Sequence, residues 1–173
     1  MTLTSITGYN KHDWIFQEDW DGTPVGLAGY LQEQTGEYYS QELRLNVEAS
    51  EDLQWYAGVS VYEEDVSADM SNQIGDASAY FGNAYYNGVI ETNSTQGDYS
   101  GWAAYINMTY QLTEKLDVSV GTRYTYDEKE TASDINGVGL LYPVITPVPV
   151  KSKQDWDDVS SRIALRYFVD EDM

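Results

Sequence analysis

The sequence has no cysteine and a single histidine, His12. Without cysteine the chain can form no disulfide and offers no thiol nucleophile, and one histidine is too few for the usual zinc sites. A Ser-His-Asp site using His12 lacks the sequence motif that accompanies a nucleophilic serine. We therefore expect no catalytic residue, no metal ion and no cofactor, which argues against an enzyme.

Long apolar runs are also missing, since no stretch approaches the roughly eighteen residues that a membrane-spanning helix needs. Basic residues are scarce, with nine Lys and Arg against 29 Asp and Glu, for a net charge of −20. No basic stripe is available for phosphate contacts, so nucleic acid is excluded as a partner. Segments 10–38, 63–99 and 127–158 carry −5, −7 and −4 of this charge. These acidic segments either form solvated surface or create a negative electrostatic potential that attracts cationic ligands.

What the sequence does have is alternation of apolar and polar residues, the period of a β-strand. It is clear in segments 39–49, 53–62, 102–112, 116–126 and 159–169, and weaker in 2–9, whose two faces the pattern leaves unassigned. Tight turns at Ser50-Glu51-Asp52 and at Leu112 to Lys115 join two pairs of segments, while the other links span roughly thirty residues. The sequence predicts an all-β fold, an antiparallel meander of about six strands with the short turns at one rim and three long loops at the other.

Aromatic residues on the apolar parity fall near the ends of the expected strands, while the mid-strand positions are aliphatic or small. Those near the long loops are Tyr39, Trp102, Tyr124 and Tyr126, and those near the short turns are Trp55, Tyr110 and Tyr167. Two aromatic girdles around an aliphatic band suit the two interfaces of a membrane. A soluble sandwich would more naturally bury its large aromatics at mid-strand. The pattern favours a barrel with a lipid-facing girdle and a polar lumen.

Two long links are candidates for ligand contact. The first runs from Asp65 to Asp98 and contains Tyr80, Phe81, Tyr85 and Tyr86 among glycines and asparagines. Tyrosine on a surface loop gives wide contact area at low entropic cost, although these rings could equally pack the loop against itself. The second runs from Gly137 to Val150, where prolines disfavour a long paired strand and indicate an extended excursion.

Several segments resemble the barrel strands of TonB-dependent outer-membrane receptors. They are Leu3 to Tyr9, Tyr38 to Leu45, Trp55 to Glu64, Tyr110 to Leu116, Gly121 to Lys129 and Trp156 to Tyr167. No single segment is a chemical signature, but their order and spacing match the family together. The resemblance covers the strands and not the long links.

The resemblance implies a 22-stranded barrel in the bacterial outer membrane, surrounded by lipid and filled by an N-terminal plug domain. Such receptors take up a scarce ligand, such as a ferric siderophore, with energy delivered by TonB. Residues 1–173 are then expected to be a partial barrel domain, with the plug, the TonB-contacting segment and the C-terminal part of the barrel absent. A soluble β-sandwich module that binds glycans and a passive outer-membrane porin are the alternatives.

Charged residues on the polar parity would face the plug in such a barrel. They are Glu42, Arg44, Glu48, Asp117, Arg123, Arg162 and Arg166. Opposite charges on neighbouring strands can pair with one another, or they can pair with side chains of the plug. The sequence leaves both possibilities open.

Overall fold

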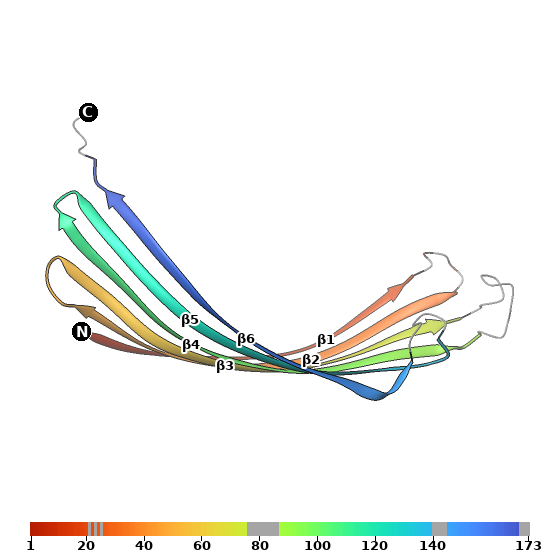
Figure 1. The fold of residues 1–173 in the computed structure, drawn as a ribbon. Coiled ribbons are helices and arrows are strands. Elements are labelled where there is room, and N and C mark those ends of the chain that lie inside the picture. The colour runs from red at the N-terminus through yellow and green to blue at the C-terminus, as the bar shows by residue number, and fades with distance from the viewer. Residues whose placement is uncertain (21, 23, 25, 76–86, 140–144, 170–173) are drawn as a thin grey trace.

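The computed structural model describes residues 1–20, 22, 24, 26–75, 87–139 and 145–169. They form six strands: β1 (Thr2–Asp19), β2 (Ala28–Glu48), β3 (Leu53–Ile74), β4 (Ile90–Thr113), β5 (Leu116–Asn136) and β6 (Thr146–Tyr167). All six lie in one antiparallel sheet in sequence order. Figure 1 shows the strands side by side in a sheet that bends strongly along its length. The predicted all-β meander is confirmed.

Both tight turns lie where the alternation predicts them. The amides of Ala49 and Ser50 donate to the carbonyl of Leu53 at 2.8 and 3.2 Å, which closes the link from β2 to β3. A two-residue turn at Glu114 and Lys115 joins β4 to β5. Figure 1 shows both turns at the same end of the sheet as the N-terminus and the end of β6. The strand ends that the other three links join lie at the opposite end of the sheet, as expected.

The expected length of those three links is wrong. The strands contain 18 to 24 residues, whereas crossing a bilayer takes only about 9–11. Of the three links that were expected to span roughly thirty residues, only segments 20–27, 75–89 and 137–145 lie outside the strands. Beyond the apolar band both faces of a strand can meet water, so alternation fades although the backbone pairing continues. Most of the residues predicted as loop therefore belong to strands.

The same correction applies to the proline-containing link. Thr146 to Val150 belong to β6, where Ser133 pairs with Val150 and Ile135 pairs with Thr146. Two steps along β5 thus correspond to four along β6. Pro147 and Pro149 lie inside this irregularity, where the missing proline N–H groups interrupt the ladder at low cost.

The register keeps each parity on one face across the whole sheet. Residues paired across the strands share a face, and one row on the apolar face comprises Leu3, Leu45, Ala57, Ile106, Thr122 and Ser161. The adjacent row on the polar face comprises Thr4, Arg44, Gly58, Tyr105, Arg123 and Ser160. The faces of β1, unassigned from the sequence, follow from this register: Leu3 and Tyr9 lie on the apolar face.

The apolar face has no second layer over it among the described residues. The two buried hydrophobic residues of the described part of the chain, Ile74 and Ala103, lie on the polar-parity face by their register. On the apolar face Val120 is 46% exposed and Ile163 73% exposed. A soluble β-sandwich needs two sheets packed face to face, so this single sheet does not fit that alternative. The described part of the chain contains no helix long and apolar enough to span a membrane.

Candidate functional site on the polar face of the sheet

Tyr80, Phe81, Tyr85 and Tyr86, the predicted ligand contacts, lie outside the described residues, and their role stays a prediction. The link that carries them is shorter than expected. Asp65 to Ile74 belong to β3, and Ile90 to Asp98 belong to β4. The stretch between these strands that could contact ligand is therefore 75–89.

The seven residues of the predicted girdles all lie on the apolar face by their register. Trp102 pairs with Tyr126, and its ring centroid lies 5.2 Å from that of Tyr124. Tyr39 pairs with Tyr9, which the sequence pattern did not single out. At the other end Trp55 pairs with Met108, Tyr110 with Leu53, and Tyr167 with Leu116. Their contact with lipid remains a prediction.

The acidic segments place several carboxylates on neighbouring strands rather than on loops. Glu37 pairs with Asp65, and Asp65 pairs with Asp98, all on the apolar-parity face beyond the outer girdle. Lys11 Nζ lies 2.5 Å from Glu37 Oε1, with both side chains about half exposed. Among the described residues no group of three or more His, Asp or Glu side chains is placed to hold a metal ion.

His12 falls in the polar link expected between segments 2–9 and 39–49, and that expectation is wrong, because His12 lies within β1. Its ring lies against the backbone of Gly36, its register partner on β2. Its Nε2 is 3.3 Å from Nε2 of Gln34. His12 is therefore part of the polar face of the sheet.

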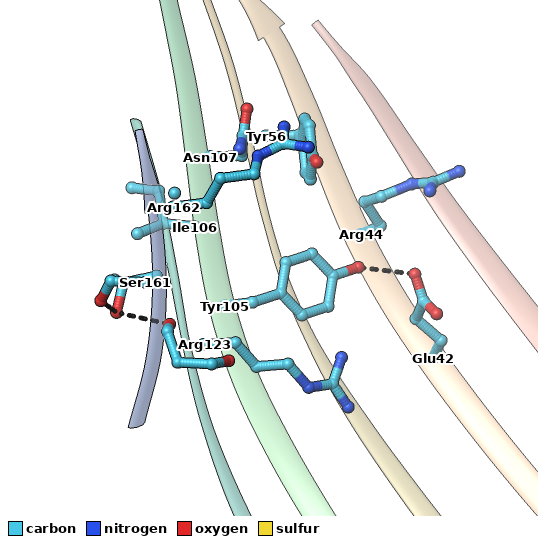
Figure 2. Close-up of a pocket in the computed structure, with 12 residues that line it drawn as sticks. Glu42, Arg44, Tyr56, Tyr105, Ile106, Asn107, Arg123, Ser161 and Arg162 are labelled. Atoms are coloured by element: carbon cyan, nitrogen blue, oxygen red, sulfur yellow. Dashed lines mark hydrogen bonds between the residues drawn. The ribbon is translucent and has the colours of Figure 1, made fainter. Parts of the chain in front are cut away.

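Two tyrosines on the polar face each reach a carboxylate two strands away by crossing a glycine. Tyr105 of β4 donates to Glu42 of β2 at 2.6 Å, and it passes over Gly58 of β3, its register partner. A Cβ at Gly58 would lie 2.5 Å from Tyr105 Oη, so any larger residue would block this path. Figure 2 shows the Tyr105 hydroxyl directed toward Glu42.

The second tyrosine bridge lies nearer the outer end of the strands. Tyr62 of β3 donates to Asp127 of β5 at 2.6 Å, and Gly101 of β4 is the register partner of both. Nearby, Tyr38 stacks on Tyr62 with ring centroids 6.1 Å apart. Neither bridge was predicted from the sequence, although tyrosines and glycines on the polar parity of neighbouring strands are a signal for them.

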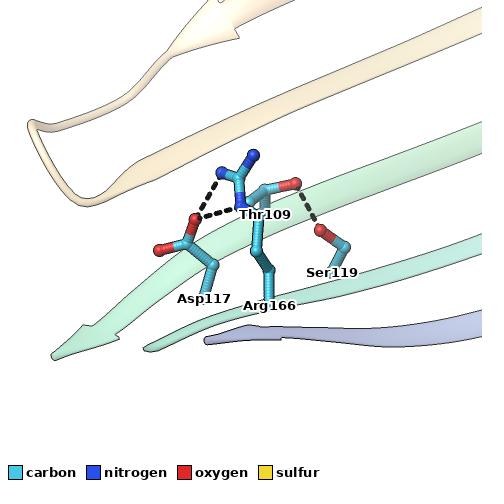
Figure 3. A network of polar contacts seen from close by, with 4 residues as sticks. All are labelled: Thr109, Asp117, Ser119 and Arg166. Atoms are coloured by element: carbon cyan, nitrogen blue, oxygen red, sulfur yellow. Dashed lines mark hydrogen bonds and ion pairs between the residues drawn. The ribbon is translucent and has the colours of Figure 1, made fainter. Parts of the chain in front are cut away.

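Asp117 and Arg166 confirm that opposite charges pair across strands. They are register partners on β5 and β6, and Oδ2 of Asp117 accepts from Nη2 and Nε of Arg166 at 2.5 and 3.1 Å. Figure 3 shows this pair next to the bond between Thr109 and Ser119, whose hydroxyl oxygens are 2.8 Å apart. The Asp117 side chain is 9% exposed and that of Arg166 67%. A carboxylate this buried needs its cation, so the pair holds β6 to β5 near the short turns.

Three further arginines, Arg44, Arg123 and Arg162, do not follow this pattern. They line an open depression of about 480 Å³ on the polar face, together with Glu42, Tyr56, Tyr105 and Asn107. Within the described part of the chain no carboxylate lies within 4.0 Å of their guanidinium groups. Arg123 Nε donates to Thr125 Oγ1 at 3.1 Å, and its guanidinium lies 5.8 Å from the Tyr105 ring.

A family model described as TonB dependent receptor-like, beta-barrel matches residues 2–173. The chain therefore belongs to the β-barrel domain family of TonB-dependent receptors. Its structure is similar to the crystal structure of FyuA, the ferric yersiniabactin uptake receptor from Yersinia pestis, with a TM-score of 0.76 at 16% identity. The match covers 98% of this chain and 24% of FyuA, so the chain spans about a quarter of that receptor. No curated protein matches the chain in sequence.

Proposed function

We propose that the chain is part of a bacterial outer-membrane receptor that takes up a scarce ligand, such as a ferric siderophore, with energy delivered by TonB. The observation that carries this proposal is the family match over residues 2–173. The uncovered apolar face of the sheet is what a barrel wall in lipid requires. FyuA, a structure similar over 98% of the chain, is a ferric yersiniabactin uptake receptor, which supports iron chelates as the first ligand class to test.

In this proposal the complete receptor has the 22-stranded barrel and plug of the family, and residues 1–173 supply six adjacent strands. The apolar face contacts outer-membrane lipid, and the polar face lines the lumen. TonB engages the receptor through parts outside this chain. The chain itself catalyses no reaction.

Uptake should depend on both the receptor and TonB. We expect that deleting the gene abolishes uptake of one radiolabelled ferric siderophore from a panel, and that deleting TonB abolishes the same uptake. Complementation with the intact gene restores it in the first strain only. Uptake that survives loss of TonB would instead indicate a passive porin, because diffusion through an open pore needs no energy source.

The aromatic residues between β3 and β4 should contribute to ligand capture. Replacing Tyr80, Phe81, Tyr85 and Tyr86 together by alanine should weaken binding of that ligand by tenfold or more, roughly the loss of one or two aromatic contacts. Equilibrium binding to the purified receptor measures the effect. A barrel that still resists heat in detergent gels shows that folding is intact, and unchanged affinity in such a barrel would contradict the assignment.

A further inference from the structure

We propose that the ligand of this receptor is a ferric chelate without net negative charge, and that the outer part of the polar face selects it. This part comprises the polar-parity residues between two rows of register partners, the row of Tyr62 and Asp127 and the row of Glu18 and Tyr30. We call it the outer lumen wall. The proposal deepens the proposed function and rests on it, because it takes the polar face as the lining of the lumen and the end opposite the tight turns as the outside.

The outer lumen wall is rich in aromatic rings. Among them are Trp14, Phe16, Tyr30, Tyr38, Tyr99 and Trp156. In the described part of the chain Trp14, Phe16 and Trp156 are exposed. At the outermost end Tyr30 stacks on Trp20, with ring centroids 5.7 Å apart. Exposed rings gathered on one surface are typical of a site that binds a ligand with apolar faces.

The charged groups of this wall are mostly acidic. Its carboxylates include Glu18, Glu64 and Asp127. Lys129 is the only lysine or arginine among the described residues of the wall. Its Nζ lies 4.9 Å from the ring centroid of Tyr99 and 5.6 Å from that of Trp156. Because two rings already attract this ammonium group, the wall offers little to an anionic ligand.

The surroundings of the wall add to its negative potential. Segments 10–38, 63–99 and 127–158 carry most of the net charge of −20 and contribute the outer halves of the strands. The arginines of the depression lie deeper: Arg123 precedes Asp127 by four residues of β5, which is about 13 Å along a strand. This distance exceeds the Debye length of about 8 Å at physiological salt. A ligand that enters from outside therefore meets the negative potential first.

Charge and rings together indicate the class of chelate. Three hydroxamate groups, each singly charged, neutralise Fe³⁺, whereas three catecholate groups, each doubly charged, leave the complex multiply anionic. The potential of the wall repels the second kind and not the first. An uncharged chelate can place apolar faces on the rings, and the side-chain amides of Asn10, Gln32 and Gln34 on this wall can donate to its carbonyl oxygens. A ferric trihydroxamate therefore fits the wall, and a ferric tris(catecholate) does not.

Equilibrium binding to the purified full-length gene product tests this charge preference. The probes are a ferric trihydroxamate and a ferric tris(catecholate), each measured at low and at high salt. We expect the trihydroxamate to bind at least tenfold more tightly at low salt, with an affinity that does not change with salt. Equal or tighter binding of the tris(catecholate), or binding of neither chelate, would overturn the proposal. Uptake that needs no TonB would instead overturn the proposed function and leave the charge preference standing.

Reversal of one charge on the wall supplies the second arm. Glu64→Lys should raise the affinity for the tris(catecholate) about fivefold at low salt and leave that for the trihydroxamate unchanged. No ion pair within the described residues involves Glu64, so its loss leaves no cation unpaired. Glu63→Lys is the matched control, because Glu63 is the adjacent residue of β3 and lies on the opposite face, paired with Tyr39. An unchanged affinity in Glu64→Lys, or an equal gain in Glu63→Lys, would show that this wall does not select the ligand.

Discussion

Leu45→Arg and Val120→Arg should each destabilise the folded barrel in lipid, reducing its free energy of unfolding by about 2–4 kcal/mol. This is the cost of a cation near the midplane of a barrel wall. Both residues lie on the apolar face between the two girdles, in adjacent rows of the sheet. Val120 is 46% exposed, with no protein layer to bury it among the described residues. An arginine there would have to leave water for hydrocarbon, or bend toward an interface.

The matched controls are the neighbouring residues on the polar face. Asn46→Arg and Ser119→Arg should cost far less, because their side chains point to the opposite side of the same strands. Folding of the full-length gene product into lipid vesicles at increasing urea concentration gives the four free energies. Equal costs for the two pairs would mean that the apolar face does not meet lipid.

The part of each strand inside the apolar band could be predicted from the sequence, because lipid on one side and water on the other impose alternation. Leu116 to Tyr126 shows this most clearly, and its partners on β4 and β6 lie in the predicted parity. Segment 2–9 was weaker because Ser5 and Thr7 occupy its apolar face, opposite Leu43 and Gln41. Its faces became clear only through pairing with β2.

The outer halves of the strands could not be predicted in the same way. Residues such as Lys11 and Glu37, or Asp65 and Asp98, are register partners on one face, but polar residues continue on the other face as well. Without a difference between the two faces, a paired strand and a solvated loop have similar sequences. The extra pairing is an outcome of backbone hydrogen bonding, which side-chain pattern does not report.

The sequence predicted which charged residues lie on the polar face. Which of their side chains contact one another depends on the register between strands. Asp117 and Arg166 are direct partners, so a cross-strand pair was foreseeable. The bond from Tyr105 to Glu42 spans three strands and depends on a glycine at position 58. No pattern within a single strand carries that information, since it arises only when three strands are aligned.

Gly101→Val should reduce the free energy of unfolding by about 3 kcal/mol, because it combines overpacking with loss of the Tyr62 to Asp127 hydrogen bond. A Cβ at this glycine would lie 2.6 Å from Asp127 Oδ1, 2.6 Å from Tyr62 Cε1 and 2.7 Å from the Tyr126 carbonyl oxygen. The two side chains can move, at the expense of their hydrogen bond of 2.6 Å. The carbonyl is part of the sheet and can shift only by disturbing the pairing of β4 with β5.

Ser100→Val is the matched control, since Ser100 is the adjacent residue of β4 and lies on the other face, between Glu63 and Glu128. We expect it to change the folding free energy by no more than about 0.5 kcal/mol. Urea titration of the full-length gene product in lipid measures both variants. Tyr62→Ala in the Gly101→Val background should restore only part of the loss, because the clash with the Tyr126 carbonyl remains. Full restoration would assign the whole cost to the ring, and no cost for Gly101→Val would contradict the close approach itself.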